Sequence, residues 1–233
     1  YLRYINDELG LTDYTKDTNA LLNQYYYADS ADSNNIYLTI VPKLRKSKSV
    51  VTRSNYLSSS LKEKIQLEIE NYKLLNSEIS FLDPVYLNMD ISLKGVGEHY
   101  NIGYKNTSKL VLRRETRSLV NESNLISKVY YIISSYIKNV KLGGTINVRD
   151  LNNEIQAIDG LIDFHTKRTD TDEKLPGLSF CIFNPIYNGK DLKFIDTTLK
   201  LKPYQIPYIE SDVAFKNKIE VTSVLESKAL SEY

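Results

Sequence analysis

The sequence predicts an α+β fold, a mixed sheet with amphipathic helices on one face, and three patterns lead to this prediction. Residues 85–93 alternate strictly between apolar and polar side chains, which is the period of a β-strand with one buried face and one wet face. Residues 57–72 and 121–139 instead repeat apolar side chains at helical spacing. No internal repeat of about 20 to 50 residues is visible, so a solenoid is not expected.

The first of these strands and helices combine into a β-α-β unit. Residues 36–41 are β-branched and aromatic, which is typical of a strand. The helix over residues 57–72 follows, and Ser60 with Glu63 forms a capping-box pattern at its start. The strand over residues 85–93 then closes the unit.

The remaining segments predict three regions along the chain. Residues 1–28 are polar and compatible with a helix, whereas the second half alternates short strands with a short helix that Asn147 would cap. Asn188-Gly189 marks a hairpin between strands at 178–186 and 192–201. The predicted regions are an N-terminal helical and loop segment over 1–35, an α+β core over 36–170 with an inserted loop at 94–118, and a β-rich extension with a polar tail over 171–233. The inserted loop is long for a plain connection, so a short strand within it and an inserted flap are both open alternatives.

The composition is that of an ordinary folded domain without a strong overall charge. The chain has 30 basic and 29 acidic residues, so no global field draws nucleic acid or an acidic membrane to it. No apolar run approaches the roughly 20 residues of a membrane span, and the first residues do not form a signal peptide. Tyr1 stands where an initiating Met would be, so we expect this chain to be a segment of a longer protein.

The sequence contains no constellation of residues that predicts catalysis, and we expect no catalytic site, metal or cofactor. The two histidines and the single cysteine are not spaced as zinc ligands. Cys181 lies in an apolar run and is expected to be a buried, unreactive thiol. Asp163 beside His165, and Asp150 with Glu154 at i,i+4 spacing, are patterns that ordinary strands and exposed helix faces also show.

Tyrosine, with 19 residues, is the most distinctive feature of the composition, because Tyr is enriched at protein interfaces. The alternative interpretation is local packing against the sheet. The candidate interface tyrosines are Tyr25, Tyr26, Tyr27, Tyr204 and Tyr208.

Two basic clusters could contact phosphate or an acidic protein, but neither has the interleaved aromatic residues of a nucleic-acid-binding surface, so nucleic acid is not expected as a partner. Their candidate contact residues are Lys43, Arg45, Lys46 and Lys48 in one loop, and Arg113, Arg114 and Arg117 in another.

The order of these elements carries a resemblance to a known family. In the first half, Ile36 to Lys43 is followed by the helix, and Phe81-Leu82-Asp83-Pro84-Val85-Tyr86-Leu87 leads into the next strand. In the second half, a helix containing Val129-Tyr130-Tyr131-Ile132-Ile133 leads to Leu142-Gly143-Gly144-Thr145, and Asp159-Gly160-Leu161 ends the unit. This arrangement resembles the baseplate J-like family over about residues 10–170. Leu161 stands where that family usually has valine.

The resemblance implies a structural component of the contractile-tail baseplate of a phage, assembled in the host cytoplasm and located in the virion. It implies as partners a second copy of the chain, in a homodimer within a ring around the tail tube, and other baseplate wedge proteins. The family carries no catalytic residues. Two alternatives stay open. One is an enzyme with a carboxylate-based site, which predicts a deep pocket holding several of Asp150, Glu154, Asp163 and His165. The other is a plain adaptor or adhesion domain with one tyrosine-rich patch.

Overall fold

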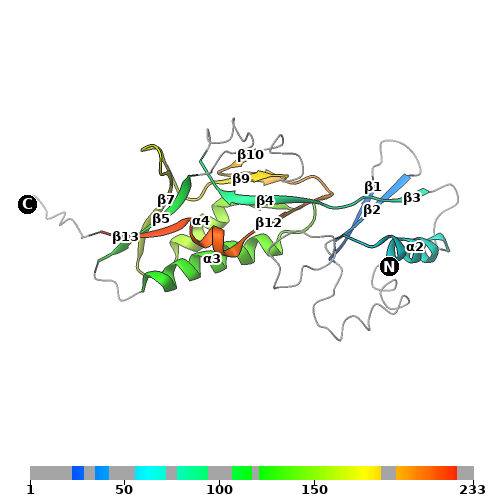
Figure 1. Cartoon of the computed structure of the whole chain (residues 1–233), viewed down its shortest axis with the longest axis horizontal. Coiled ribbons are helices and arrows are strands. Elements are labelled where there is room, and N and C mark those ends of the chain that lie inside the picture. Colours follow the sequence, from blue (N-terminus) through cyan, green and yellow to red (C-terminus); the bar gives the residue numbers. More distant parts are fainter. Residues whose placement is uncertain are drawn as a thin grey trace, which may run out of the picture.

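The computed structural model describes residues 23–28, 35–41, 56–71, 78–93, 107–116, 121–184 and 193–224. These residues form helices and mixed sheets, which confirms the predicted α+β class. Figure 1 shows an elongated molecule in which a small lobe lies at one end of a larger body. Each part has a hydrophobic cluster of its own.

The small lobe consists of a three-stranded sheet and one helix. Its elements are β1 (Asn23–Ala28), β2 (Asn35–Val41), α2 (Ser59–Glu70) and β3 (Glu78–Phe81). The sheet has the order β1-β2-β3, with β1 antiparallel and β3 parallel to β2. Ile65 and Ile69 of α2 are buried in one cluster with Leu38 and Ile40 of β2. The helix therefore covers one face of this sheet.

Three expectations for this lobe are corrected by the structure. The helix expected within residues 1–28 is a strand over 23–28, because its tyrosines pair in register with β2 and aromatic side chains suit a pleated surface. The β-α-β unit closes on residues 78–81, which reach β2 first, and not on residues 85–93. Helix α2 is capped by Ser58, whose side chain accepts a hydrogen bond from the backbone N–H of Leu61 at 3.3 Å. Residues 1–22 lie outside the described residues.

The body contains two four-stranded sheets and a two-stranded pair. Its strands are β4 (Val85–Ile91), β5 (Ser108–Glu115), β6 (Thr145–Asn147), β7 (Leu161–Arg168), β8 (Lys174–Pro176), β9 (Phe180–Phe183), β10 (Lys193–Ile195), β11 (Thr198–Lys200), β12 (Gln205–Tyr208) and β13 (Ile219–Val224). The first sheet has the order β10-β9-β4-β12 and the second has the order β13-β5-β7-β8. Strand β12 is parallel to β4, and β13 is parallel to β5. Strands β6 and β11 form the antiparallel pair.

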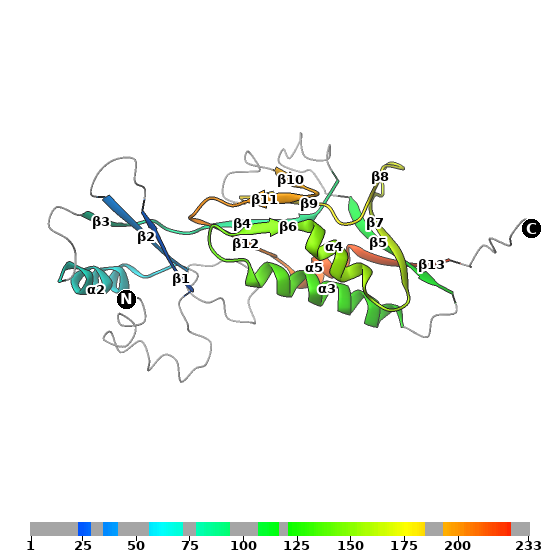
Figure 2. The ribbon, with the colours of Figure 1, turned by 180° about the vertical axis from the view of Figure 1, so that it is seen from behind.

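Three helices complete the body. They are α3 (Glu122–Asn139), α4 (Val148–Gln156) and α5 (Asp212–Lys216). Helix α3 contacts α4, α5, β12 and β13, and Figure 2 shows α3 and α4 on the same side of the strands. Leu125, Val129 and Ile133 of α3 are completely buried in one cluster with Met89 and Leu112 of the two sheets. The predicted placement of amphipathic helices on one face is thereby confirmed.

The helix cap and the glycine turns predicted in the second half of the chain are confirmed by the structure. The Asn147 side chain caps α4 by accepting a hydrogen bond from the N–H of Arg149 at 3.1 Å. Gly143 has φ +63°, and a Cβ atom there would lie 2.7 Å from the Cα of Pro203. Only glycine fits so close to that backbone. Gly160, with φ +81°, makes the turn expected from the Asp159-Gly160 pair.

Two predicted regions of the body are corrected. Residues 108–115 of the expected inserted loop form β5, an inner strand whose Leu110 and Leu112 are completely buried. The expected C-terminal extension also belongs to the core, since β9, β12 and β13 complete both sheets and Phe215 of α5 is buried in the main cluster. The strand expected over 192–201 is two strands, β10 and β11, which join different sheets. Strands β9 and β10 pair antiparallel, while Asn188-Gly189 between them lies outside the described residues.

The packing of α3 predicts a sharp contrast between two neighbouring helix positions. Ile133→Ala should lower the free energy of unfolding by about 2–5 kcal/mol, because the completely buried side chain leaves a cavity in the main core. Tyr131→Ala, at a side chain that is 70% exposed, should change it by less than about 0.5 kcal/mol. Urea denaturation followed by circular dichroism measures both. Equal losses in the two variants would contradict the burial of this helix face.

Candidate interaction sites

A cluster of tyrosines joins the small lobe to the body. Tyr56, just before α2, packs edge-on against Tyr86 of β4, with ring centroids 5.5 Å apart and an interplanar angle of 82°. Tyr86 packs in the same way against Tyr208 of β12 at 6.1 Å. Val41 of β2 and Leu142 complete this cluster, which we call the joint cluster. Edge-to-face packing of this kind stabilises aromatic pairs beyond the area that they bury.

One candidate interface tyrosine, Tyr208, belongs to the joint cluster, and the other candidates lie elsewhere. Tyr208 is buried inside the chain, and burial raises the pKa values of Tyr86 and Tyr208, so both rings stay neutral. Tyr204 is half-buried, with the Lys202 ammonium 6.0 Å from its ring centroid. Residues 25–27 lie on β1, at the edge of the small sheet. Tyr208 therefore packs inside the chain, as the alternative interpretation expected.

Strand β4 has no wet face, which corrects the expectation drawn from its alternating pattern. Asn88 is buried, and its side-chain amide donates to the Glu210 carboxylate at 3.1 Å. The Glu210 backbone N–H donates to the Asn88 side-chain oxygen at 3.1 Å. Asp90 forms an ion pair with Lys218, and both side chains are largely buried. The covering residues come from the segment after β12, which the sequence alone placed in a polar tail.

Cys181 is buried in β9, opposite Asp90 of β4. Burial raises the pKa of its thiol to about 12, and the nearby Asp90 carboxylate acts in the same direction. The thiolate, which is the nucleophilic form, is therefore scarce at neutral pH. The structure agrees with the expectation of a buried, unreactive thiol.

The basic residues of the second predicted cluster are strand residues in ion pairs. Arg113 lies on β5 and donates to Asp163 of β7 at 2.6 Å. Arg114 donates to Glu122 at the start of α3 at 3.0 Å. On the same sheet, Lys109 and Lys167 pair with Glu220 of β13. These carboxylates balance the positive charge, which weakens any attraction to phosphate. The first cluster, 43–53, and residues 105 and 117 lie outside the described residues.

The candidate catalytic residues do not converge. Asp163 is held by Arg113, while burial and the nearby Lys174 lower the pKa of His165. Asp150 and Glu154 are exposed on α4. Within the described residues, no group of three or more His, Cys, Asp or Glu side chains could hold a metal ion. No helix in this part of the chain is long and apolar enough to cross a membrane.

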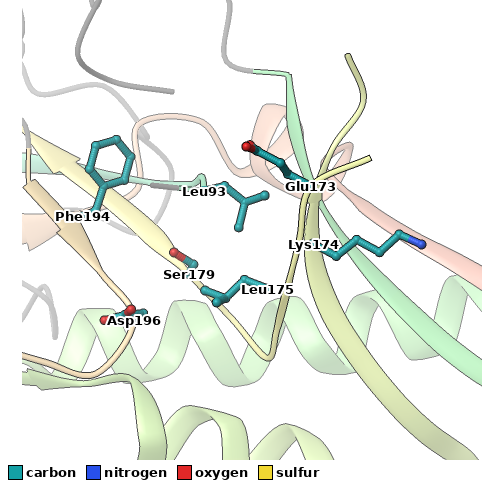
Figure 3. A pocket seen from close by; sticks show the side chains of 7 residues that line it. All are labelled: Leu93, Glu173, Lys174, Leu175, Ser179, Phe194 and Asp196. Atoms are coloured by element: carbon teal, nitrogen blue, oxygen red, sulfur yellow. The ribbon is translucent and has the colours of Figure 1, made fainter. Parts of the chain in front are cut away.

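A cavity of about 470 Å³ lies where β8 of the second sheet approaches the first sheet. We call it the sheet-junction pocket. Figure 3 shows the side chains that line it: Leu93, Glu173, Lys174, Leu175, Ser179, Phe194 and Asp196. None of Asp150, Glu154, Asp163 and His165 is among them. The sequence carries no motif for this pocket, because its lining comes from four separate segments.

Comparison with models of known protein families finds no match to this chain, and comparison with curated proteins finds none either. The resemblance described above therefore rests on the order of elements and turns in this sequence. Any functional conclusion has to be argued from the surfaces and contacts described here.

From the joint cluster we predict that the Tyr56 side chain keeps the small lobe packed against the body. Tyr56→Ala removes the lobe's aromatic contact with Tyr86 while leaving β4 and β12 intact. Small-angle X-ray scattering should then show a larger radius of gyration, and hydrogen exchange in α3 should stay unchanged. Ile162→Ala, which removes a partly exposed apolar side chain from β7 of the body, is the matched control. Identical scattering from both variants and the unaltered chain would contradict this role.

Burial of Cys181 predicts a thiol that reacts only after unfolding. Because its pKa is raised to about 12, the folded state keeps the proton at pH values where the unfolded chain has lost it. This contribution to stability is complete below the ordinary thiol pKa and disappears as the pH rises toward 12. At pH 8, a disulfide reagent should label the denatured chain rapidly and the folded chain at a rate set by unfolding. Rapid stoichiometric labelling of the folded chain would show that the thiol is accessible.

Proposed function

We propose that this chain is a structural component of a baseplate wedge in a phage contractile tail. In this proposal it resembles the C-terminal part of the wedge subunit of T-even-type phages. It forms protein–protein contacts in a ring around the tail tube, with a second copy of itself and with other wedge proteins. It assembles in the host cytoplasm and remains in the virion.

The observation that carries the proposal is the order of elements at the residues that bear the resemblance. Strand β2, helix α2 and strands β3 and β4 follow one another in the first half. Helix α3, the turn at Gly143, strand β6, helix α4 and the turn at Gly160 follow in the second half. This agreement supports a baseplate J-like arrangement.

The two-part build of the molecule supports an assembly role. Within the described residues, the lobe and the body have separate hydrophobic clusters, and the small joint cluster packs between them. Between β3 and β4 the connection is short, consisting of residues 82–84. A component of this shape can contact different neighbours through its two ends, as a ring subunit must.

The exposed apolar side chains of the body indicate one surface for such contacts. Tyr131 of α3 and Val213 of α5 are both 70% exposed, and these two helices contact one another. Single exposed apolar residues are common on any protein. Two of them on helices that contact one another, one being tyrosine, make the exposed residues of α3 and α5 the first to test for contact with another subunit.

Sedimentation velocity over a roughly hundredfold range of concentration tests the assembly proposal. We expect a concentration-dependent shift to a dimer or a larger ring-like species. The double variant Tyr131→Ser and Val213→Ser should weaken that shift. Ile162→Ser, at a 38% exposed position on β7, is the matched control and should leave it unchanged.

A chain that remains monomeric at every concentration, and shows no rings by negative-stain electron microscopy, would contradict self-assembly. Association that the double variant and the control weaken equally would contradict only the choice of surface.

A further inference from the structure

The sheet-junction pocket has a rigid inner wall. Leu93 is 5% exposed, and its backbone N–H donates to the Ser108 hydroxyl at 3.2 Å. The backbone N–H of Ser92 donates to the carbonyl oxygen of Ser179 at 3.1 Å. These bonds fix the ends of β4 and β9 relative to β5. The pocket is therefore preformed, and its volume is within the usual range for ligand sites.

The pocket is also lined by the side chain of Ser179. Ser179 is 1% exposed and lines the cavity. Its backbone N–H donates to the Thr166 hydroxyl at 3.1 Å and its carbonyl accepts from Ser92, so the backbone is satisfied. As part of the lining, the side-chain hydroxyl can contact an occupant of the pocket. A buried hydroxyl gains from an occupant that offers it a hydrogen bond.

The charge at the rim of the pocket is negative. Asp196 is exposed and forms no ion pair within the described part of the chain. Glu173 forms an ion pair with Arg168 at 3.4 Å, and Arg168 also pairs with Asp170 at 2.7 and 3.0 Å, so Asp196 is the carboxylate available to a ligand. Figure 3 shows the Lys174 side chain directed away from the other lining residues. Two carboxylates thus border a cavity whose walls include Leu93, Leu175 and Phe194.

We propose that the sheet-junction pocket binds a basic side chain presented by a partner protein, with its alkyl stem on the leucines and its charged group beside Asp196. This inference rests on the proposed function, because it gives an assembly component a specific docking site. Arginine fits best, since its planar guanidinium group can form two parallel hydrogen bonds to one carboxylate. Arginine is also among the residues that dominate binding energy at interfaces.

Other occupants match the lining less well. An acidic side chain would be repelled by the Asp196 carboxylate. A purely apolar side chain would cover the Ser179 hydroxyl without bonding to it, which costs free energy. A basic side chain alone satisfies the apolar walls, the hydroxyl and the charges together.

The probe for this site is arginine capped as N-acetyl-arginine methylamide, titrated into the isotope-labelled chain and followed by two-dimensional NMR. We expect the amide signals of Leu93, Leu175, Ser179 and Phe194 to shift in a saturable manner. N-acetyl-norleucine methylamide, which has a similar stem without charge, should bind at least about threefold more weakly. Butylguanidine has the same charge and stem but no peptide groups. Comparing its affinity with that of capped arginine distinguishes a site for a protein side chain from a site for a free small cation.

Charge removal tests the same site from the side of the protein. Asp196→Asn should weaken binding of capped arginine by roughly two- to fivefold, as expected for one exposed ion pair. Glu154→Gln, at an exposed carboxylate on α4, is the control and should leave binding unchanged. An unchanged NMR fingerprint elsewhere establishes that each variant is folded.

Three outcomes would overturn the inference. They are the absence of shifts at these four residues, equal shifts with capped norleucine, or equal affinity in Asp196→Asn and the unaltered chain. Tighter binding of butylguanidine than of capped arginine would assign the pocket to a small cation and overturn the protein partner. If the chain associates in sedimentation but fails these tests, only the pocket proposal is contradicted. If the chain binds the probe but never associates, the proposed self-assembly is contradicted.

Discussion

Strand β4 is buried on both faces, and much of the body is arranged to meet that constraint. Its apolar face is covered by α3, which the chain supplies soon after β5. Its polar face carries Asn88 and Asp90, and buried polar groups must find partners inside the protein. Those partners are Glu210 and Lys218, which lie 122 and 128 residues further along the chain. The C-terminal segment is therefore as much a part of the core as β4 itself.

Sequence reasoning succeeded where the signal is local. The apolar stripe of α3, the cap at Asn147 and the turn at Gly160 are each encoded within a few residues. It failed where the partner is distant. Strand β5 looked like a loop because Lys109, Arg113 and Arg114 interrupt its apolar pattern, and their partners lie on β13, β7 and α3. The pattern of β4 could not reveal that its polar side would be covered.

The candidate sites differ in the same way. The apolar neighbours of Cys181 in the sequence correctly predicted a buried, unreactive thiol. Tyr208 is instead buried inside the chain, because β12 pairs with β4. The sheet-junction pocket had no sequence signal, since its lining comes from segments that meet only in the fold. Within the described residues, the surfaces proposed for partners are the exposed side chains of α3 and α5 and the sheet-junction pocket. They lie on different elements, so they can be altered independently of one another.

The parallel edge strands have a consequence for how the chain is made on the ribosome. Strands β12 and β13 pair with β4 and β5, which are translated far earlier, so the first body sheet stays incomplete until residue 208 has emerged and the second until residue 224. The small lobe closes its own sheet by residue 81, long before that point. The nascent chain therefore passes through a stage with a formed lobe and open sheet edges, which are sites for aggregation or chaperone binding. Pauses in translation after the lobe would lengthen that stage, whereas rapid synthesis of the last third would shorten it.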